Sequence, residues 1–157
     1  MLNNEMLGKI LKEKKLTISI AESCTGGLIS KLITDISGSS EYFIIGVVAY
    51  SNEAKKKILQ VKTETLEKYG AVSSQCAREM VEGLKFISGS HICISTTGIA
   101  GPTGGTKDKP VGLVYCGFAI FNEIFTEKIF LKGERTQIRE QTANFCLKLL
   151  IKRLTNG

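Results

Sequence analysis

The segment TISIAESCTGGLISKLITDIS, residues 17–37, decides the fold because its hydrophobic period changes partway along. Its first part, Thr17-Ile-Ser-Ile-Ala21, alternates in polarity as a β-strand does. The run Glu22–Gly27 interrupts this pattern. The apolar residues that follow recur at helical spacing, and they are Leu28, Ile29, Leu32, Ile33 and Ile36. We therefore expect a strand at 17–21, a glycine-containing turn, and a helix over 25–37.

The rest of the chain continues this alternation and then ends differently. The patterns predict helices at 4–15, 52–59, 63–69, 73–87 and 135–154, and strands at 43–50, 91–97, 111–120 and 124–131. The last two strands read as a hairpin with its tip near Asn122-Glu123. This order predicts an α/β fold: one three-layer α/β/α domain over 1–157, with a mixed, mainly parallel sheet and no linker or repeat.

Composition supports a single folded domain. The 157 residues are 43% hydrophobic and 23% charged, which is ordinary for a globular protein and excludes a disordered chain. The segment Met1–Lys15 lacks the continuous apolar region of a signal peptide. The longest nearly continuous apolar run, Phe43–Tyr50, is far shorter than the roughly 20 residues that cross a bilayer. We expect a cytoplasmic protein with no membrane partner.

The cysteine and histidine residues limit the chemistry. The five cysteines (Cys24, Cys76, Cys93, Cys116 and Cys146) are scattered, so neither a zinc motif nor a disulfide framework is indicated. We expect reduced thiols, no metal and no cofactor. The chain has one histidine, His91, on which any Ser-His-Asp triad would depend. Hydrolytic chemistry in this chain therefore needs another base.

The net charge of +6 arises from 21 basic and 15 acidic residues. The basic residues are mostly lysines, spread along the chain without interleaved aromatic side chains, which is unfavourable for base stacking. This pattern favours a solvated surface over nucleic-acid binding, and it is compatible with an anionic small ligand.

Three segments are candidates for a site at the carboxyl ends of the strands. In the first, Ala21–Gly27, Ser23 and Thr25 precede a helix and Gly26 permits a close backbone approach. The same residues are also typical of a structural helix cap. Cys24 is an alternative nucleophile, but without a nearby activating histidine it is read as a packing residue.

The second segment, Val48–Lys55, places Tyr50 at the end of a strand and Lys55 on the first turn of the next helix. A lysine in a partly apolar site has a lowered pKa and can act as a base. Periodicity alone favours the alternative, in which the lysines at 55–57 form one exposed helix face.

The third segment, Gly98–Thr106, has glycines at 98, 101, 104 and 105 and fits neither GxGxxG nor GxxxxGK[ST]. It is read either as a backbone cradle for a phosphate or ribose or as a structural turn. Arg135, just before the last helix, is a candidate phosphate ligand, with a surface ion pair as the alternative.

Three strings in order resemble the C-terminal domain of CinA: AESCTGGLISKLITDISGSSEYFIIGVVAYSNEAK (21–55), GAVS (70–73) and TTGIAGPTGGTKDKPVGLVY (96–115). The resemblance covers about residues 5–154. Stand-alone members of this family, called PncC, are nicotinamide-nucleotide amidohydrolases, or NMN deamidases. The resemblance implies hydrolysis of the carboxamide of nicotinamide mononucleotide to nicotinate mononucleotide and ammonia. It also implies that the family's N-terminal nucleotide-processing domain is absent.

The resemblance also implies roles for individual residues. Ser23 matches the nucleophile, Lys55 the general base and Tyr50 the tyrosine that assists it, which together form a Ser-Lys type amidase. The matching substrate-binding positions are Thr25, Gly26, Ser39, Ser40, Gly98, Gly101, Gly104 and Arg135. We expect N–H groups at the start of the 25–37 helix to stabilise the oxyanion, and we expect a homo-oligomer, as a dimer. The alternative function is a non-catalytic nucleotide-binding or regulatory CinA-like module.

Overall fold

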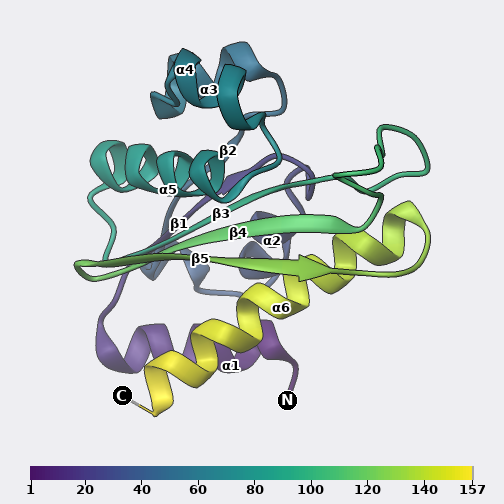
Figure 1. Cartoon of the computed structure of the whole chain (residues 1–157). Helices are drawn as coiled ribbons and strands as arrows, with labels where there is room; N and C mark the ends of the chain where they lie inside the picture. The colour runs from purple at the N-terminus through teal and green to yellow at the C-terminus, as the bar shows by residue number, and fades with distance from the viewer. Residues whose placement is uncertain (157) are drawn as a thin grey trace.

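The computed structural model describes residues 1–156 and has a five-stranded sheet between two layers of helices (Figure 1). The strands are β1 (Ile18–Glu22), β2 (Phe43–Val48), β3 (Ile92–Gly98), β4 (Leu113–Ile120) and β5 (Glu123–Phe130). Their order is β2-β1-β3-β4-β5; β1 pairs parallel with β2 and β3, and β4 pairs antiparallel with β3 and β5. All strands but β4 thus run in one direction, which confirms a mixed, mainly parallel sheet.

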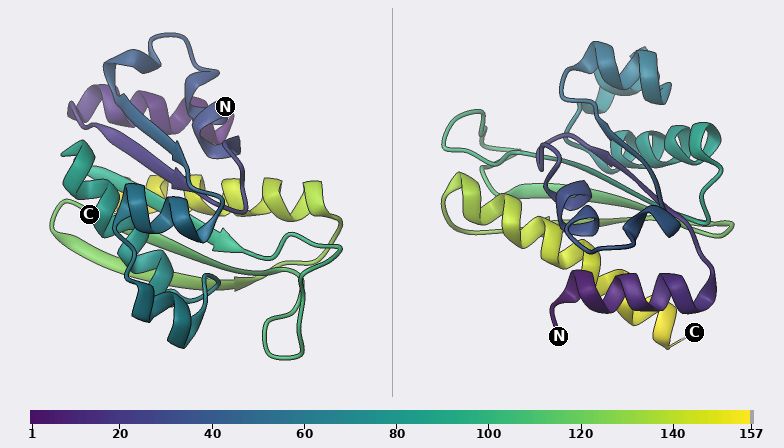
Figure 2. Two further views of the ribbon diagram at one scale, coloured as in Figure 1. Left: turned by 90° about the horizontal axis from the view of Figure 1, so that it is seen from above. Right: turned by 180° about the vertical axis from the view of Figure 1, so that it is seen from behind.

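Helices cover both faces of the sheet (Figures 1 and 2). One face carries α1 (Asn3–Lys14), α2 (Leu28–Thr34) and α6 (Arg135–Thr155), and the other carries α3 (Asn52–Leu59), α4 (Thr63–Tyr69) and α5 (Ser74–Ser88). A 3₁₀ turn, η1 (Ser39–Glu41), precedes β2. The predicted three-layer α/β/α architecture is therefore confirmed. Within residues 1–156, no helix combines the length and the apolar composition that crossing a bilayer requires.

Strand alternation divides the core into two apolar clusters. In β1, Ile18 and Ile20 pack with the helices α1, α2 and α6, whereas Ala21 packs with the layer that contains α5. In β3, Ile94 and Cys93 divide between the two faces in the same way. Every residue of β1 is buried, as expected for a central strand of a sheet that is covered on both sides.

The helix expected over 25–37 is shorter than predicted, since α2 spans only Leu28–Thr34. The backbone explains its late start: Gly26 and Gly27 have φ values of 59° and 103°, outside the right-handed helical region. The segment 23–27 is therefore a turn between β1 and α2. The hairpin tip also shifts by one residue, to Phe121-Asn122.

The chain leaves the parallel strands β1, β2 and β3 at the same edge of the sheet. Three connecting segments therefore meet there: the turn 23–27, the segment 49–51 before α3, and the loop 99–112. Arg135, the first residue of α6, also lies at this edge, where it donates a hydrogen bond to Gly101. This convergence is the arrangement that places ligands at the carboxyl ends of strands in α/β proteins.

Candidate active site

Ser23 and Lys55 meet at the carboxyl end of β1. The Lys55 Nζ donates hydrogen bonds to the Ser23 Oγ and to the Tyr50 carbonyl oxygen, each at 3.0 Å. Lys55 is 2% exposed and Ser23 8%. The Ser51 side chain caps α3 by accepting from the Ala54 N–H, which directs the first turn of α3 back over the strand ends. The alternative in which Lys55 belongs to an exposed lysine face is thereby excluded.

Burial lowers the pKa of the Lys55 ammonium, because a charged amine loses its hydration inside the protein. In the described chain no carboxylate lies within 4.0 Å of its Nζ. Thiolates at Cys76 or Cys24 would raise its pKa. However, burial raises the pKa of Cys76 to about 11 and that of Cys24 to about 12, so both thiols are neutral near pH 7. The environment therefore favours a neutral amine beside the Ser23 hydroxyl.

The turn that carries Ser23 is anchored on β3. The Ser23 N–H donates to the Thr96 carbonyl at 3.1 Å, and the hydroxyls of Thr25 and Thr96 share a hydrogen bond of 2.8 Å. Thr25 is fully buried, so its hydroxyl fixes the turn. In residues 1–156 the N–H groups of Thr25 and Gly27 have no hydrogen-bond acceptor. The free N–H groups thus lie in the turn itself, whereas we expected them at the start of a longer helix.

Glu22, immediately before Ser23, is a buried residue that the sequence analysis did not single out. Its carboxylate accepts hydrogen bonds from the N–H groups of Ile29 and Ser30, at 2.9 and 3.0 Å, and from the Ser30 hydroxyl at 2.8 Å. The helix-capping residue Gly27 has no side chain, so Glu22 performs this role from β1. The sequence offered Ser23 and Thr25 as capping residues, so it gave no signal for this role of Glu22.

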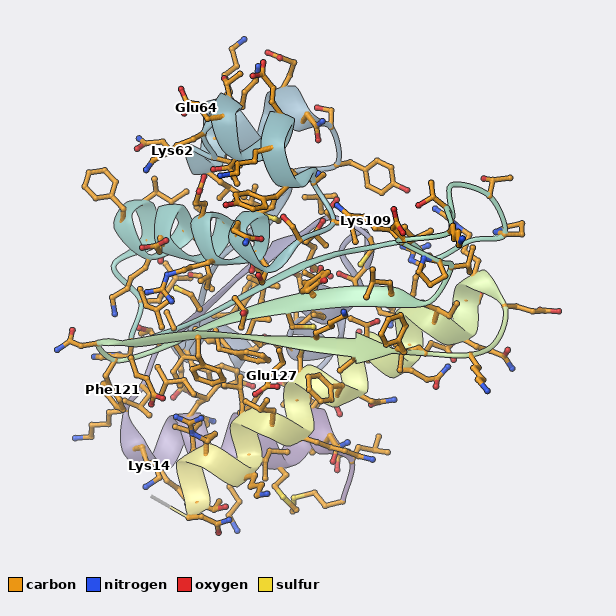
Figure 3. All side chains as sticks on the ribbon, viewed as in Figure 1. Lys14, Lys62, Glu64, Lys109, Phe121 and Glu127 are labelled. Carbon is orange, nitrogen blue, oxygen red and sulfur yellow. The ribbon has the colours of Figure 1, made fainter. Side chains whose placement is uncertain are left out.

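A cleft of about 250 Å³ lies beside the turn that carries Ser23, where Cys24, the next residue, forms part of its wall. Its lining comes from three connecting segments and from α6: Cys24, Tyr50, Gly98, Ile99, Ala100, Gly101, Thr103, Gly104 and Arg135. Lys109, labelled in Figure 3, fastens the glycine loop to α4 by donating to the Tyr69 carbonyl. The predicted loop glycines 98, 101 and 104 therefore line the same cleft.

Arg135 connects two walls of this cleft. Its Nη1 donates to the Gly101 carbonyl at 2.7 Å, and its Nη2 donates to the Tyr50 hydroxyl at 2.9 Å. The alternative of a surface ion pair is not observed, because no carboxylate pairs with Arg135 in the described chain. Tyr50 is 60% exposed and its phenol bonds to Arg135, so the Tyr50 backbone carbonyl is the group that contacts Lys55. Of the two expected routes for the Ser23 proton, directly to Lys55 or through Tyr50, the geometry favours the direct one.

Arg139, one helical turn after Arg135, was also missed by the sequence analysis. Its Nη2 donates to the Thr25 carbonyl at 2.9 Å. The sequence signal was the spacing, because arginines at i and i+4 on a helix present the same face. Within residues 1–156, no three His, Cys, Asp or Glu side chains are placed to hold a metal ion.

Ser39 and Ser40, expected among the substrate-binding residues, do not reach this cleft within one chain. They form η1, which precedes β2, and the first residue of β2, Phe43, pairs with Ile18 at the start of β1. Ser23 follows the other end of β1. At about 3.3 Å per residue, the length of the strand separates the two serines from Ser23 by roughly 15 Å.

A larger cavity, of about 530 Å³, lies at the opposite end of the sheet, between Lys14 and Phe121 (Figure 3). Its lining includes Arg153, which pairs with Glu123, and otherwise mostly apolar side chains. It contains no nucleophile beside a base. The smaller cleft next to Ser23 and Lys55 is therefore the candidate active site.

Comparison with known proteins gives a consistent family match. Residues 3–154 match the CinA C-terminal domain family. The chain is 57% identical over 145 residues to a CinA-like protein of Fusobacterium nucleatum, covering 92% of this chain and 35% of that protein. It is 50% identical over 151 residues to a CinA-like protein of Thermotoga maritima, covering 96% and 36%. The chain thus spans about a third of the length of these curated relatives.

Solved structures share the whole fold. The competence/damage inducible protein CihA of Agrobacterium tumefaciens is 40% identical with a TM-score of 0.89, and the alignment covers 95% of this chain and 93% of that one. A competence or damage-inducible protein of Enterobacter asburiae is 33% identical with a TM-score of 0.94, covering 98% and 96%.

Proposed function

The chain belongs to the CinA C-terminal domain family, and from this premise we propose that it is an amidohydrolase that uses Ser23 as nucleophile and Lys55 as base. The observation that carries the proposal is the 3.0 Å hydrogen bond between the Lys55 Nζ and the Ser23 Oγ inside a buried site. The substrate is a carboxamide, and the family resemblance indicates nicotinamide mononucleotide, which is converted to nicotinate mononucleotide and ammonia.

In the first half of the reaction, the neutral Lys55 amine takes the proton from the Ser23 hydroxyl. The Ser23 Oγ attacks the carboxamide carbon and forms a tetrahedral intermediate with a negatively charged oxygen. The N–H groups of Cys24, Thr25 and Gly27, unpaired within residues 1–156, are the available donors for this oxyanion. Lys55, now protonated, gives its proton to the amide nitrogen, the C–N bond breaks, and ammonia leaves.

In the second half, water replaces ammonia. Neutral Lys55 removes a proton from the water, which attacks the ester carbon of the acyl-enzyme. Collapse of this second intermediate breaks the bond to Ser23 Oγ, which recovers its proton from Lys55. The product is the carboxylic acid. Burial lowers the pKa of Lys55, which makes its ammonium a better proton donor to the leaving nitrogen and makes the neutral amine more available as a base than in a free lysine.

The residues that line the cleft are chemically suited to bind a phosphorylated nucleotide. Arg135 has no carboxylate partner within residues 1–156, and guanidinium groups bind phosphate oxygens through two parallel hydrogen bonds. The glycine loop 98–104 allows the backbone to approach a ribose closely. Arg135 and the loop glycines are therefore proposed as the substrate-binding wall, opposite the Ser23 and Lys55 pair.

The direct test is ammonia release from nicotinamide mononucleotide by the purified protein, with nicotinamide, its riboside and NAD compared as substrates. Ser23→Ala and Lys55→Met are expected to lower kcat by at least about 10³-fold, as expected when a nucleophile or its base is removed. Lys57→Met is the matched control, because Lys57 is an exposed lysine on the same helix. Wild-type turnover by Ser23→Ala or Lys55→Met would overturn the assigned roles.

A non-catalytic module would behave differently in the same preparation. Calorimetry would then detect nucleotide binding, while no ammonia would be released at any enzyme concentration. That outcome would overturn the proposed activity and favour a binding or regulatory role.

A further inference from the structure

We propose that Arg139 is a positioning residue that holds the turn 24–27 in its catalytic conformation. The inference rests on the proposed function, because it concerns the turn that carries the nucleophile and the oxyanion donors. Arg139 lies in the second turn of α6, and its partner Thr25 lies between β1 and α2, 114 residues away in the sequence. A single side chain thus joins the C-terminal helix to the backbone beside Ser23.

The Thr25 carbonyl is the point at which the turn is held. It accepts a hydrogen bond from the Leu28 N–H at 3.0 Å and a second from the Arg139 Nη2 at 2.9 Å. The N–H groups of Thr25 and Gly27, on either side of this peptide, have no acceptor within residues 1–156, and neither has the Cys24 N–H. Fixing the carbonyl fixes the plane of the Thr25–Gly26 peptide, and with it the direction of the neighbouring N–H groups.

Gly26 shows how closely the guanidinium packs against the turn. A Cβ at this position would lie 2.3 Å from the Arg139 Nη2, well inside contact distance. The positive φ of Gly26, 59°, also favours glycine. The backbone thus favours glycine at position 26, and a larger residue there would displace the Arg139 guanidinium from the turn.

The remaining donors of Arg139 indicate that the guanidinium is not there for an ion pair. No carboxylate lies within 4.0 Å of it in the described chain, and its Nε is buried without an acceptor. Burying an unpaired donor costs free energy. The hydrogen bond to Thr25 is the one polar interaction found for this side chain in residues 1–156. We therefore infer that this bond is the reason why the guanidinium is buried despite the unpaired Nε.

Arg139 and Arg135 differ in what they touch. Arg135 lines the cleft and bonds to Tyr50 and Gly101, whereas Arg139 is absent from the cleft lining. Substrate therefore meets Arg135 directly, and Arg139 acts on the reaction only through the turn. The two arginines should accordingly affect different kinetic constants.

The kinetic test compares Arg139→Gln and Arg139→Lys with Arg153→Gln, a control at the far end of the same helix. With rates corrected for the folded fraction, Arg139→Gln should lower kcat for nicotinamide mononucleotide on the order of 10–100-fold, with KM changed less than about threefold. This is less than the 10²–10³-fold loss typical of removing an oxyanion donor outright. Arg139→Lys should recover part of kcat. A raised KM with unchanged kcat, or wild-type kinetics, would overturn the inference.

A second measurement does not depend on activity. Gly26→Ala should lower the melting temperature markedly in the wild type and by much less in an Arg139→Ala background, because the clash with Nη2 is then gone. The backbone strain at φ 59° is common to both backgrounds and cancels in the comparison. If Gly26→Ala lowered the melting temperature equally in the two backgrounds, the proposed packing of Arg139 against the turn would be wrong. If the wild type released no ammonia, the proposed function would fail, and this cycle would still decide whether Arg139 holds the turn.

Discussion

Lys55 and Ser23, 32 residues apart in sequence, are joined by a hydrogen bond of 3.0 Å between the lysine Nζ and the serine Oγ. The pair is assembled by two parallel neighbours in the sheet: Ser23 follows β1, and Lys55 lies on the helix that follows β2. No carboxylate accompanies the lysine in the described chain, so its proton affinity is set mainly by burial. Protonation of Lys55 should therefore control the reaction.

The first prediction concerns the pH dependence of the reaction. Because burial lowers the pKa of Lys55, the neutral base forms at a lower pH than in a free lysine, which titrates at about 10.4. The rate constant kcat/KM should rise with pH through one titration below that value and then level off. Lys57→Met should leave the titration unchanged. A rate that continues to rise up to pH 10 would contradict a lowered pKa.

The second prediction concerns stability. The pKa of Lys55 is lower in the folded than in the unfolded chain, so between the two values the unfolded chain binds more protons and the free energy of unfolding rises with pH. At any pH below the pKa of the unfolded chain, the burial of Lys55 therefore destabilises the protein. Lys55→Met should therefore raise the free energy of unfolding near pH 7 by on the order of 1–2 kcal/mol, the range of such active-site trade-offs.

This gain in the free energy of unfolding should shrink as the pH approaches the pKa of free lysine, because Lys55 then becomes neutral in both the folded and the unfolded chain. Urea unfolding of the wild type and of Lys55→Met at pH 7 and pH 10 measures the difference. A variant that is less stable than the wild type at pH 7 would show that the amine contributes more through its hydrogen bonds than its burial costs.

The third prediction concerns Glu22. Glu22→Ala removes the acceptor of two helix N–H groups and of the Ser30 hydroxyl in a fully buried position, so it should destabilise the fold by about 2–4 kcal/mol. Glu22→Gln keeps one acceptor oxygen and should cost less. Glu64→Ala, an exposed glutamate on α4 (Figure 3), is the control and should change stability by less than about 0.5 kcal/mol. Equal losses for Glu22→Ala and Glu64→Ala, measured by urea unfolding, would refute the capping role.

The sequence was sufficient for the architecture because strand and helix periods are local properties. The helix at 63–69 was predicted with the bounds that the structure shows. The helix ending at Leu59 was expected to have Asn52 as its cap, but Ser51 is the cap and the helix starts one residue earlier. Every expected strand is present within two residues, β2 ending at Val48 rather than at Tyr50. The start of α2 was wrong by three residues, since consecutive glycines at 26 and 27 can either begin a helix or, as here, adopt positive φ. A single sequence does not distinguish these two outcomes.

Contacts between distant segments set the limit for the site. The resemblance placed Ser23 and Lys55 in one motif, but it could not show that the Tyr50 phenol turns toward Arg135, which lies 85 residues later. The contact between Arg139 and Thr25 spans 114 residues and involves a backbone carbonyl, which leaves no residue-type signal at position 25. Ser39 and Ser40 lie close to Ser23 in sequence, yet α2 carries the chain to the other end of the sheet.

The last prediction separates binding of the phosphate from catalysis. Arg135 lines the cleft, and no carboxylate of residues 1–156 pairs with it, so its guanidinium is available for the phosphate of nicotinamide mononucleotide. Arg135→Gln should raise KM for this substrate about 10–100-fold, as expected for one charged hydrogen-bonding group, and should change kcat much less. Arg135→Lys should recover little, because an ammonium cannot make the two-pronged contact.

The riboside, which lacks the phosphate, is the internal comparison for Arg135. The kcat/KM for the riboside should be low in the wild type and nearly the same in Arg135→Gln, because the riboside has no phosphate for Arg135 to bind. An Arg135→Gln variant that loses the same factor on both substrates would place Arg135 elsewhere in the mechanism, as a brace between Tyr50 and Gly101. The hydrogen bonds to Tyr50 and Gly101 make this structural role the main alternative to phosphate binding. Comparing the two substrates distinguishes between the two roles.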